Sequence, residues 1–307
     1  MKNRPEQQHF ITKAYQNNFC DSQGKVYIYD LKINKWRKTQ PLNEFKENNF
    51  QTLYECENLD PYFLEKEFGK IEDLAIKIID KIIKNKELPE NNEELSYVIN
   101  LMGIFGMRNP VKRDLLQKVH SQRPRAILKA ITKDEDTYHS FMKQMQAEGI
   151  IKKIIPYKKA LDDINNGKVV LQINHDKLIM SMLELSSYLV DLLAKKNWQL
   201  VEAHDGEFIS SNNPLNIINI DDNTKHEPYF ELKNNIITFP LSSHFALVSS
   251  SSEQTLKAVI IDKSVIDDIN SITAYNGSTH ILASKELKLP EKSVALALKN
   301  FHQGFSN

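Results

Sequence analysis

The chain carries a histidine and several charged side chains beside apolar runs. Each of these residues could have either a catalytic role or a structural role in the core. His9 precedes Phe10 and Ile11 near the N-terminus. A histidine can act as a general base near neutral pH because its unperturbed pKa is about 6.5. A buried histidine that bonds a backbone carbonyl and fixes the N-terminal segment is the structural alternative. Both roles are open from the sequence.

Glu72 lies within an apolar stripe of helical period and follows Glu65 by seven residues. Residues seven apart project from nearly the same side of a helix, so this carboxylate pair could hold a metal ion or transfer protons. An ordinary solvated face, with Lys66 and Glu67 beside Glu65, would show the same spacing. We expect Glu72 instead to pair with an arginine from the following helix.

Arg108 follows an apolar run, Leu101–Met107, whose two glycines allow neighbouring helices to approach closely. Its guanidinium has five donors, which suit a carboxylate such as Glu72 or a phosphate group. Arg113 comes five residues later, and we expect it to point to the same side. Arg113 and His120 also have the R-x6-H spacing found in helical ribonuclease toxins, although a solvated basic helix gives this spacing by chance.

Small polar residues follow the ends of predicted strands in the C-terminal third. Ser211 and Asn212 belong to a predicted turn, His244 follows a Pro-Leu-Ser-Ser run, and Asn270 lies in a predicted helix before the last strand. No G-x-S-x-G motif surrounds the serines, so a hydrolase-type nucleophile is not predicted. These side chains could hydrogen-bond a ligand or a phosphate. The preference of Asn and Pro for turns is the alternative explanation.

A predicted hairpin at residues 25–39 carries Tyr27, Tyr29 and Trp36 among basic residues. Aromatic rings interleaved with basic side chains can stack on nucleic-acid bases. An exposed hairpin with solvated lysines has the same pattern, so the hairpin is a candidate nucleic-acid contact and no more.

Composition limits the classes of partner. Forty Lys and Arg balance forty Asp and Glu in 307 residues, so no overall field favours a nucleic acid or an anionic membrane. A nucleic-acid role would therefore require a local basic patch. The chain has nine glycines and neither a phosphate-loop nor a dinucleotide-binding motif, so the sequence specifies no cofactor and no metal.

The cysteines and the N-terminus indicate a cytoplasmic protein. Cys20 and Cys56 lie far apart without metal-ligand spacing, which is typical of reduced thiols in the cytosol. The N-terminus is too polar for a signal peptide, and no apolar run approaches the roughly 20 residues that a membrane span needs. We therefore expect no membrane contact.

The hydrophobic period predicts an α+β fold in one domain, residues 1–307. Residues 1–58 form a short helix and the hairpin, residues 59–197 a helical block, and residues 198–307 a strand-rich part. We expect a mostly antiparallel sheet built from both chain ends, with the helical block inserted. Helices are expected at 9–19, 60–84, 93–107, 110–120, 124–130, 134–148, 156–166, 175–195, 264–274 and from 286 or 290 to 301. Strands are expected in the hairpin and near 199–202, 207–210, 215–218, 236–239, 245–249, 258–261 and 279–284.

An ordered set of short motifs resembles the bacterial family DUF4238, a domain of unknown function. The set runs over nearly the whole chain: Gln8 to Tyr15 with Asn18 and Phe19, Val26 to Asp30, Glu65 with Lys70 to Glu72, Arg108 with Pro110 and Arg113, Phe208 to Pro214, Pro240 to Ser242, and Asn270. The resemblance implies a shared fold and a shared polar pocket. It implies no established activity.

The chain departs from the family pattern at three places. Thr12 stands where proline is usual, Asn212 where aspartate is usual, and Ser243-His244 where proline and arginine are common. An asparagine at position 212 cannot serve as a carboxylate base or as a strong ligand for a hard metal ion. If the family's chemistry depends on that aspartate, this chain is altered or inactive.

We hypothesise an enzyme that acts on a phosphate-bearing substrate, a nuclease-like or toxin-like effector of bacterial phage defence. His9 or Glu72 would supply the base, and Arg108 and Arg113 would neutralise developing phosphate charge. The alternative is a non-catalytic module that senses a nucleotide or a protein. It is motivated by Asn212, by the missing metal motif and by the neutral net charge. A nucleic acid, a nucleotide or a protein is thus the expected partner.

Overall fold

The N-terminal hairpin pairs with the last strand of the described chain. The computed structural model describes residues 7–55, 59–149, 151–166, 168, 174–219, 235–250, 255–277 and 279–289. Strand β2 (Val26–Asp30) lies between β3 (Lys35–Thr39) and β11 (His280–Ala283), and β6 (Ser210–Ser211) pairs with the other edge of β11. All three pairings are antiparallel. The prediction that both chain ends build one sheet is confirmed.

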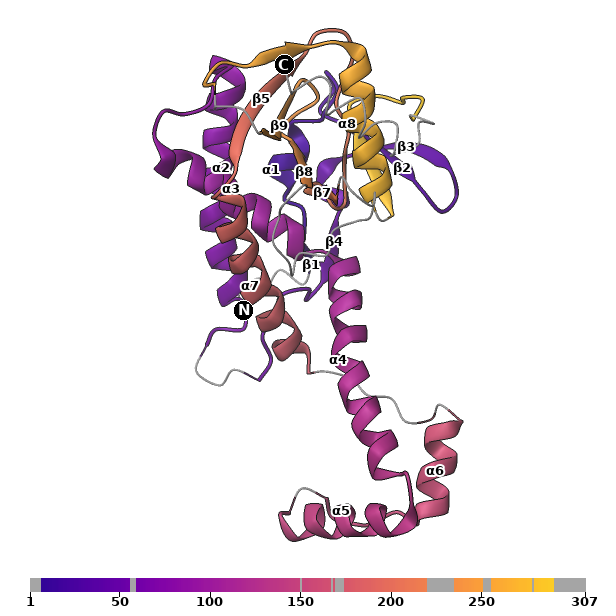
Figure 1. Cartoon of the computed structure of the whole chain (residues 1–307). Coiled ribbons are helices and arrows are strands. Elements are labelled where there is room, and N and C mark those ends of the chain that lie inside the picture. The colour runs from indigo at the N-terminus through magenta and orange to yellow at the C-terminus, as the bar shows by residue number, and fades with distance from the viewer. Residues whose placement is uncertain are drawn as a thin grey trace, which may run out of the picture.

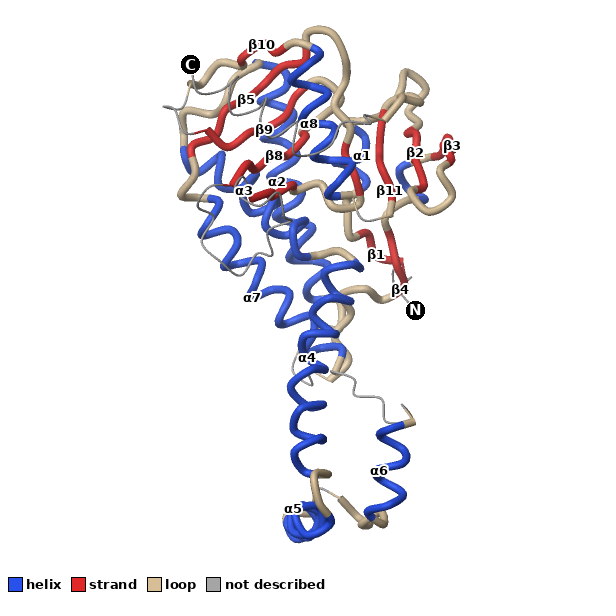
Figure 2. The backbone as a smooth tube through the Cα atoms, turned by 45° about the vertical axis from the view of Figure 1, so that its right-hand side comes forward, coloured by secondary structure: helices blue, strands red, loops and turns tan. Residues whose placement is uncertain are grey.

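A second sheet of five strands forms much of the strand-rich part (Figure 2). Its order is β10 (Val259–Ile261), β5 (Asn197–Ala203), β9 (Phe245–Ser250), β8 (Asn235–Pro240) and β7 (Asn216–Asn219). Neighbours are antiparallel except β10, which runs parallel to β5. The α+β class is confirmed, but the strands divide between separate sheets.

A third, two-stranded sheet consists of β1 (Gln7–His9) and β4 (Lys46–Asn48), which pair antiparallel. A short 3-10 turn, Pro41–Asn43, precedes β4. The sequence predicted a helix over 9–19, but the helix α1 covers only Lys13–Asn17. Thr12 explains the later start, because its hydroxyl caps α1 by accepting a hydrogen bond from the Ala14 N–H at 3.0 Å.

The chain changes sheets between β6 and β7. The Ser211 hydroxyl donates to the Asn213 carbonyl at 2.8 Å and accepts from the Asn213 N–H at 3.0 Å, which forms a tight turn. Pro214 follows and has no N–H to donate to a strand partner. The strand predicted at 207–210 is therefore reduced to a two-residue strand, and the next begins at Asn216.

Three long helices pack side by side in the head of the molecule (Figure 1). They are α2 (Phe63–Asn85), α3 (Asn92–Met107) and α7 (His175–Leu193). Helices α3 and α7 approach closely at Gly103, where a Cβ would lie 2.4 Å from Val190 Cγ2 and 3.1 Å from the Ser186 carbonyl oxygen. On the other side, helix α8 (Lys263–Asn276) packs isoleucines against the five-stranded sheet.

Tyr15 joins the N-terminal segment to the strand-rich part. Its ring lies 5.3 Å from that of Phe105 and 5.6 Å from that of Phe239, between centroids. Its hydroxyl donates to the Pro240 carbonyl at 2.6 Å and shares a 2.8 Å hydrogen bond with the Ser210 hydroxyl. Burial raises the pKa of Tyr15 far above its usual range, so the hydroxyl keeps its proton. Three separated family motifs therefore meet in one buried contact.

Helices α4 (Pro110–Ile131), α5 (Glu135–Ala147) and α6 (Tyr157–Asn165) project from the head as an arm, visible in Figures 1 and 2. Helix α4 begins at the Asn109 cap and continues through position 124, where two separate helices were predicted. A proline removes one backbone hydrogen bond, but the neighbouring turns keep theirs. Of the closing helix expected from 286 or 290 to 301, residues 286–289 are described and are not helical, and the rest lies outside the described residues.

Gly103 of α3 and Gly69 of α2 give opposite expectations for stability. Gly103→Ala should lower the free energy of unfolding by about 1–3 kcal/mol, because its Cβ overlaps Val190. Gly69→Ala is the matched control, since a Cβ there meets nothing within 4 Å and alanine favours a helix by up to about 1 kcal/mol. Urea unfolding of the two variants measures both values. Equal effects would contradict the close approach of α3 and α7.

Candidate functional site

Arg108 lies at the end of α3 and is buried, with 5% of its surface exposed. One guanidinium nitrogen, Nη2, donates to Glu72 on α2, and Nη1 donates to the Gln51 side-chain oxygen at 3.3 Å. The guanidinium also lies 4.8 Å from the centroid of the Phe68 ring. Its Nε is buried and has no partner among the described residues. The expected pairing of Glu72 with an arginine of the next helix is therefore present.

Gln51 extends this contact to a second carboxylate. Its side-chain amide donates to Glu65 at 2.6 Å, so Gln51 bridges Glu65 and Arg108. Burial raises the pKa of Glu65, while the hydrogen bond from Gln51 and the charge of Arg108 lower it and Glu72 raises it. Glu65 therefore holds a proton to a higher pH than an exposed glutamate does. Gln51 lies in a loop, where no residue pattern marks it as a member of the site.

His9 reaches the same region from β1. Burial lowers the pKa of His9, and the charges of Lys46, Arg108 and Lys13 lower it too, against a hydrogen bond to the Leu42 carbonyl that raises it. Its Nε2 is buried without a partner among the described residues, so the bond to Leu42 comes from Nδ1. The ring is thus neutral near pH 7. It presents an unused lone pair at Nε2.

Gln8 holds the loop of Gln51 against β1. Its side-chain oxygen accepts from the Gln51 backbone N–H at 2.7 Å, and its amide donates to the Thr52 hydroxyl at 3.1 Å. Gln8 is fully buried. We call the resulting group the polar centre, with the members His9, Gln51, Glu65, Glu72 and Arg108.

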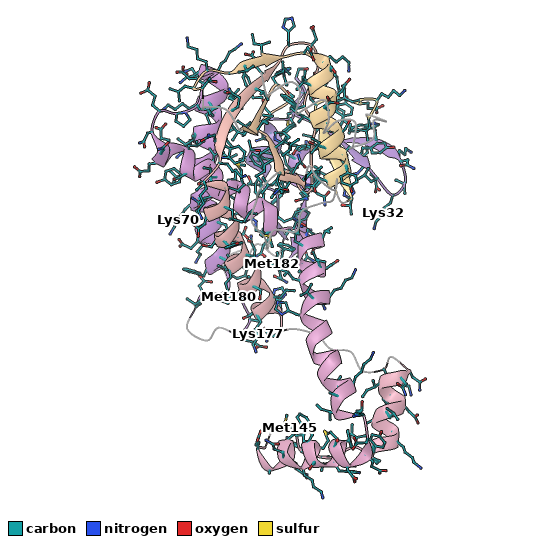
Figure 3. All side chains as sticks on the ribbon, viewed as in Figure 1. Lys32, Lys70, Met145, Lys177, Met180 and Met182 are labelled. Carbon is teal, nitrogen blue, oxygen red and sulfur yellow. The ribbon has the colours of Figure 1, made fainter. Side chains whose placement is uncertain are left out.

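A small apolar cavity borders the polar centre. Its space for a water-sized molecule is about 20 Å³, and its polar lining comes from Arg108, Gln51 and Ser186. Met182 of α7, labelled in Figure 3, lies on its apolar side. A space of this size holds about one water molecule. It is too small for a nucleotide.

Arg113 lies next to the polar centre but has its own partner. It donates to Glu47 of β4 at 2.6 Å, and its guanidinium lies 5.1 Å from the centroid of Phe50, which also lines the cavity. No contact joins Arg113 to His120 among the described residues, so the R-x6-H spacing forms no site there.

The polar residues of the C-terminal part do not join the polar centre, contrary to expectation. The Asn212 side-chain oxygen accepts from the N–H groups of Thr279 and His280, both at 3.1 Å. Asn270 accepts from the Ile209 N–H at 2.9 Å and donates to the Glu207 carbonyl at 2.8 Å. These amides satisfy loop backbone groups that would otherwise be buried without partners.

Two more expected ligand-binding residues are also separate from the polar centre. Ser211 is fully buried and bonds the backbone of Asn213 within the turn described above. His244 is exposed. The link between the two regions is a 3.5 Å contact from the Asn109 amide to the Asn213 side-chain oxygen. The shared pocket that the resemblance implied therefore divides into a polar centre and a backbone-bonded turn.

The hairpin does not offer a free stacking surface. The Tyr29 and Trp36 rings pack on each other at 5.1 Å between centroids. Lys38 lies over the Tyr27 ring at 5.2 Å and pairs with Asp21 at 2.6 Å, and Arg37 pairs with Glu44. Its aromatic rings and two of its basic groups are thus engaged within the protein, so this candidate nucleic-acid contact loses its support.

Two classes of site are absent from the described part of the chain. No three or more His, Cys, Asp or Glu side chains gather there in a way that could hold a metal ion. Likewise, none of the helices within the described ranges is long and apolar enough to span a bilayer.

The fold and site define a class: an α+β head with a buried polar centre and a projecting helical arm. The chain belongs to the DUF4238 family, a protein family of unknown function, whose sequence pattern matches residues 7–286. Comparison of this chain with curated proteins and with solved structures found no match. The resemblance drawn from the motifs is thus confirmed.

Removing one partner of the buried ion pair should be costly. Arg108→Met leaves Glu72 without its counter-ion and should lower the free energy of unfolding by about 3–5 kcal/mol. Adding Glu72→Leu should recover part of that loss. Lys81→Met is the control, because its pair with Glu94 is exposed and contributes about 1 kcal/mol or less. A double variant no more stable than Arg108→Met would contradict a coupled pair.

His9 should make stability depend on pH. Its folded pKa lies below the unfolded value of about 6.5, so the unfolded state binds more protons as the pH falls past that value. The stability contributed by neutral His9 is complete above pH 6.5 and is lost as the pH falls through the folded pKa. His9→Gln should flatten the unfolding free energy measured between pH 7 and 5. An unchanged slope would mean that His9 is not buried in neutral form.

Proposed function

We propose that the chain hydrolyses a phosphate ester at the polar centre, as a nuclease-like or toxin-like effector of bacterial phage defence. One observation carries the proposal: among the described residues Arg108 has a buried, unpartnered Nε, and His9, whose pKa the charge of Arg108 lowers, has a buried, unpartnered Nε2. Unsatisfied buried polar atoms are rare, and each calls for an explanation such as a ligand or a catalytic role. Titratable groups with shifted pKa values are also concentrated at functional sites.

His9 and Glu65 have the properties of a base and an acid. Neutral His9 would take a proton from water at Nε2, and the water oxygen would attack phosphorus. The bond from phosphorus to the leaving oxygen would break, and Glu65 would give its proton to that oxygen. The products are a phosphate monoester and an alcohol. Proton exchange with solvent would then restore both residues.

Arg108 would stabilise the negative charge that develops on the phosphate oxygens. At rest Glu72 acts as its counter-ion, and a phosphate would compete with Glu72 for the guanidinium. The phosphate and the attacking water would approach from the partly exposed side of Glu65 and Glu72.

A second candidate is the non-catalytic module that senses a nucleotide or a protein. It is favoured by the engagement of Ser211, Asn212 and Asn270 with backbone groups and by a cavity that holds only one water. On this view the polar centre is a joint between the N-terminal segment and the helices. Ligand binding without turnover would support it.

Hydrolysis is tested with purified protein and end-labelled RNA, DNA and nucleotides, with and without divalent metal. His9→Asn should reduce turnover about 100- to 10,000-fold through loss of the base, and Glu65→Gln should reduce it through loss of the acid. His204→Asn is the matched control, since His204 is 69% exposed and outside the polar centre. The rate should fall at acid pH as His9 gains a proton, with a midpoint below the ordinary histidine pKa of about 6.5 because burial lowers the pKa of His9.

Circular dichroism and urea unfolding of the same preparations show whether each variant is folded. Turnover that survives both His9→Asn and Glu65→Gln in folded protein would overturn the proposed site. Turnover lost equally in His204→Asn would point to a contaminant or to a general loss of structure.

A further inference from the structure

The net charge of the chain is zero, but the charges are unevenly distributed and the arm is basic. Residues 110–166, which form α4 to α6, contain 12 Lys and Arg and 7 Asp and Glu. The remaining residues contain 28 Lys and Arg and 33 Asp and Glu. The arm therefore has a net charge of +5 and the rest of the chain −5. Figures 1 and 3 show that the far end of the arm stands clear of the head, and the described lysines of α5, α6 and the loop between them are exposed.

Two tyrosines fix the bend at the far end of the arm. The Tyr138 hydroxyl of α5 donates to the Ile155 carbonyl at 2.7 Å, and the Tyr157 hydroxyl of α6 donates to the Thr132 carbonyl at 3.1 Å. The two rings lie 5.5 Å apart between centroids. The loop between α5 and α6 is thereby held against the end of α4.

Five lysines belong to the three segments that these tyrosine hydrogen bonds join, and we call the group the elbow. Its members are Lys133 after α4, Lys152 and Lys153 in the loop, and Lys158 and Lys159 in the first turn of α6. All are exposed, and none forms an ion pair with any residue that the structure describes. The nearby Asp163 pairs instead with Lys168 at 3.3 Å.

Some lysines of the head differ from those of the elbow because they pair with a carboxylate: Lys38 with Asp21, Lys70 with Glu67, Lys81 with Glu94, Lys86 with Glu202, Lys263 with Asp267 and Lys285 with Glu207. Other exposed lysines of the head, such as Lys77 and Lys195, form no ion pair with described residues. Clustered cations without counter-ions repel one another, and the repulsion is relieved when a polyanion binds. Apart from Asp134, whose pKa the charge of Lys133 lowers, the elbow is thus a charged surface without a partner among the residues that the structure describes.

We propose that the elbow and α4 bind the phosphate backbone of a nucleic acid. The proposal rests on the proposed function for one claim, that the bound polymer is also the substrate. Stable binding to a membrane surface generally uses an apolar face as well as lysines. The large apolar side chains exposed on α4 and beside the elbow are Val111, Val119 and Ile155, which belong to two separate segments. Phosphate contacts need only the lysines.

Helix α4 connects the elbow to the polar centre. It starts two residues after Arg108 and contains Arg113 in its first turns, and its 22 residues extend for about 33 Å. A duplex lying along it would cover about ten base pairs, at 3.4 Å for each step. A nucleic acid docked at the elbow would therefore reach the polar centre, whereas a dinucleotide would not span the distance.

The test compares two variants with the same change of charge. The elbow variant carries Lys152→Ala, Lys153→Ala, Lys158→Ala and Lys159→Ala. The control variant carries Lys32→Ala, Lys77→Ala, Lys84→Ala and Lys195→Ala, four exposed lysines of the head that form no ion pair with described residues. The elbow substitutions are mild for folding, because removing positive charge from the first turn of α6 does not oppose the helix dipole.

Binding is measured by fluorescence anisotropy with labelled duplex and single-stranded oligonucleotides over a series of salt concentrations. All proteins carry His9→Asn, so the oligonucleotides remain intact. The elbow variant should bind a duplex at least about tenfold more weakly than its parent. The slope of log affinity against log salt is negative, and its magnitude should be about 3 to 4 lower for the elbow variant than for the parent. Each of the four lost phosphate contacts contributes about 0.9 to that magnitude. The control variant should behave like the parent.

Three results would overturn the proposal: equal affinities and slopes for elbow variant and parent, an equal loss in the control variant, or binding to phosphatidylserine vesicles without binding to nucleic acid. Failure of the proposed hydrolysis is distinguishable. If turnover of a dinucleotide depends on His9 but polymer binding is the same in the elbow variant and the parent, the proposed hydrolytic site stands and the elbow is rejected as a docking surface. Elbow-dependent binding without turnover would retain the surface and reject hydrolysis.

Discussion

The buried pairing of Arg108 with Glu72 is the contact on which the arrangement of this protein depends. Arg108 ends α3, immediately before the cap of α4, and it contacts α2 through Glu72 and the N-terminal loop through Gln51. A buried charge without a partner is strongly unfavourable, so these segments must meet for Arg108 to be tolerated. The base of the arm is thereby fixed to the head. The pairing of Arg108 with Glu72 therefore positions both the polar centre and the base of the helical arm.

The fold was largely predictable because its elements have clear periods. The shift from alternating residues at Val26–Asp30 to a helical stripe after Asp60 separated the hairpin from the helices. The helix starts expected at 93, 110 and 264 lie within one residue of the observed starts at Asn92, Pro110 and Lys263. The division into several sheets was not predictable. It depends on one turn at Ser211, where side-chain bonds to the backbone interrupt the ladder over a span too short to give a pattern.

The site was predictable only where opposite charges had to be buried together. Glu72 in an apolar stripe and Arg108 after an apolar helix each required a partner, and they are partners. Asn212 and Asn270 could not be placed, because an asparagine that binds a ligand and one that binds the backbone look the same in sequence. The elbow was missed for another reason. The charge was summed over the whole chain, whereas the fold separates the arm from the acidic remainder.

The most direct measurement of the central claim is the nuclear magnetic resonance signal of the Arg108 Nε–H group, assigned by its absence in Arg108→Lys. Dimethyl phosphate, the smallest phosphate diester, would be added to isotopically labelled protein while this signal and the His9 ring nitrogens are followed. If the polar centre receives a phosphate, both should shift together and saturate, and His204 should not move. Unchanged signals for Arg108 and His9 at saturating ligand would contradict the account and leave the polar centre as a structural joint.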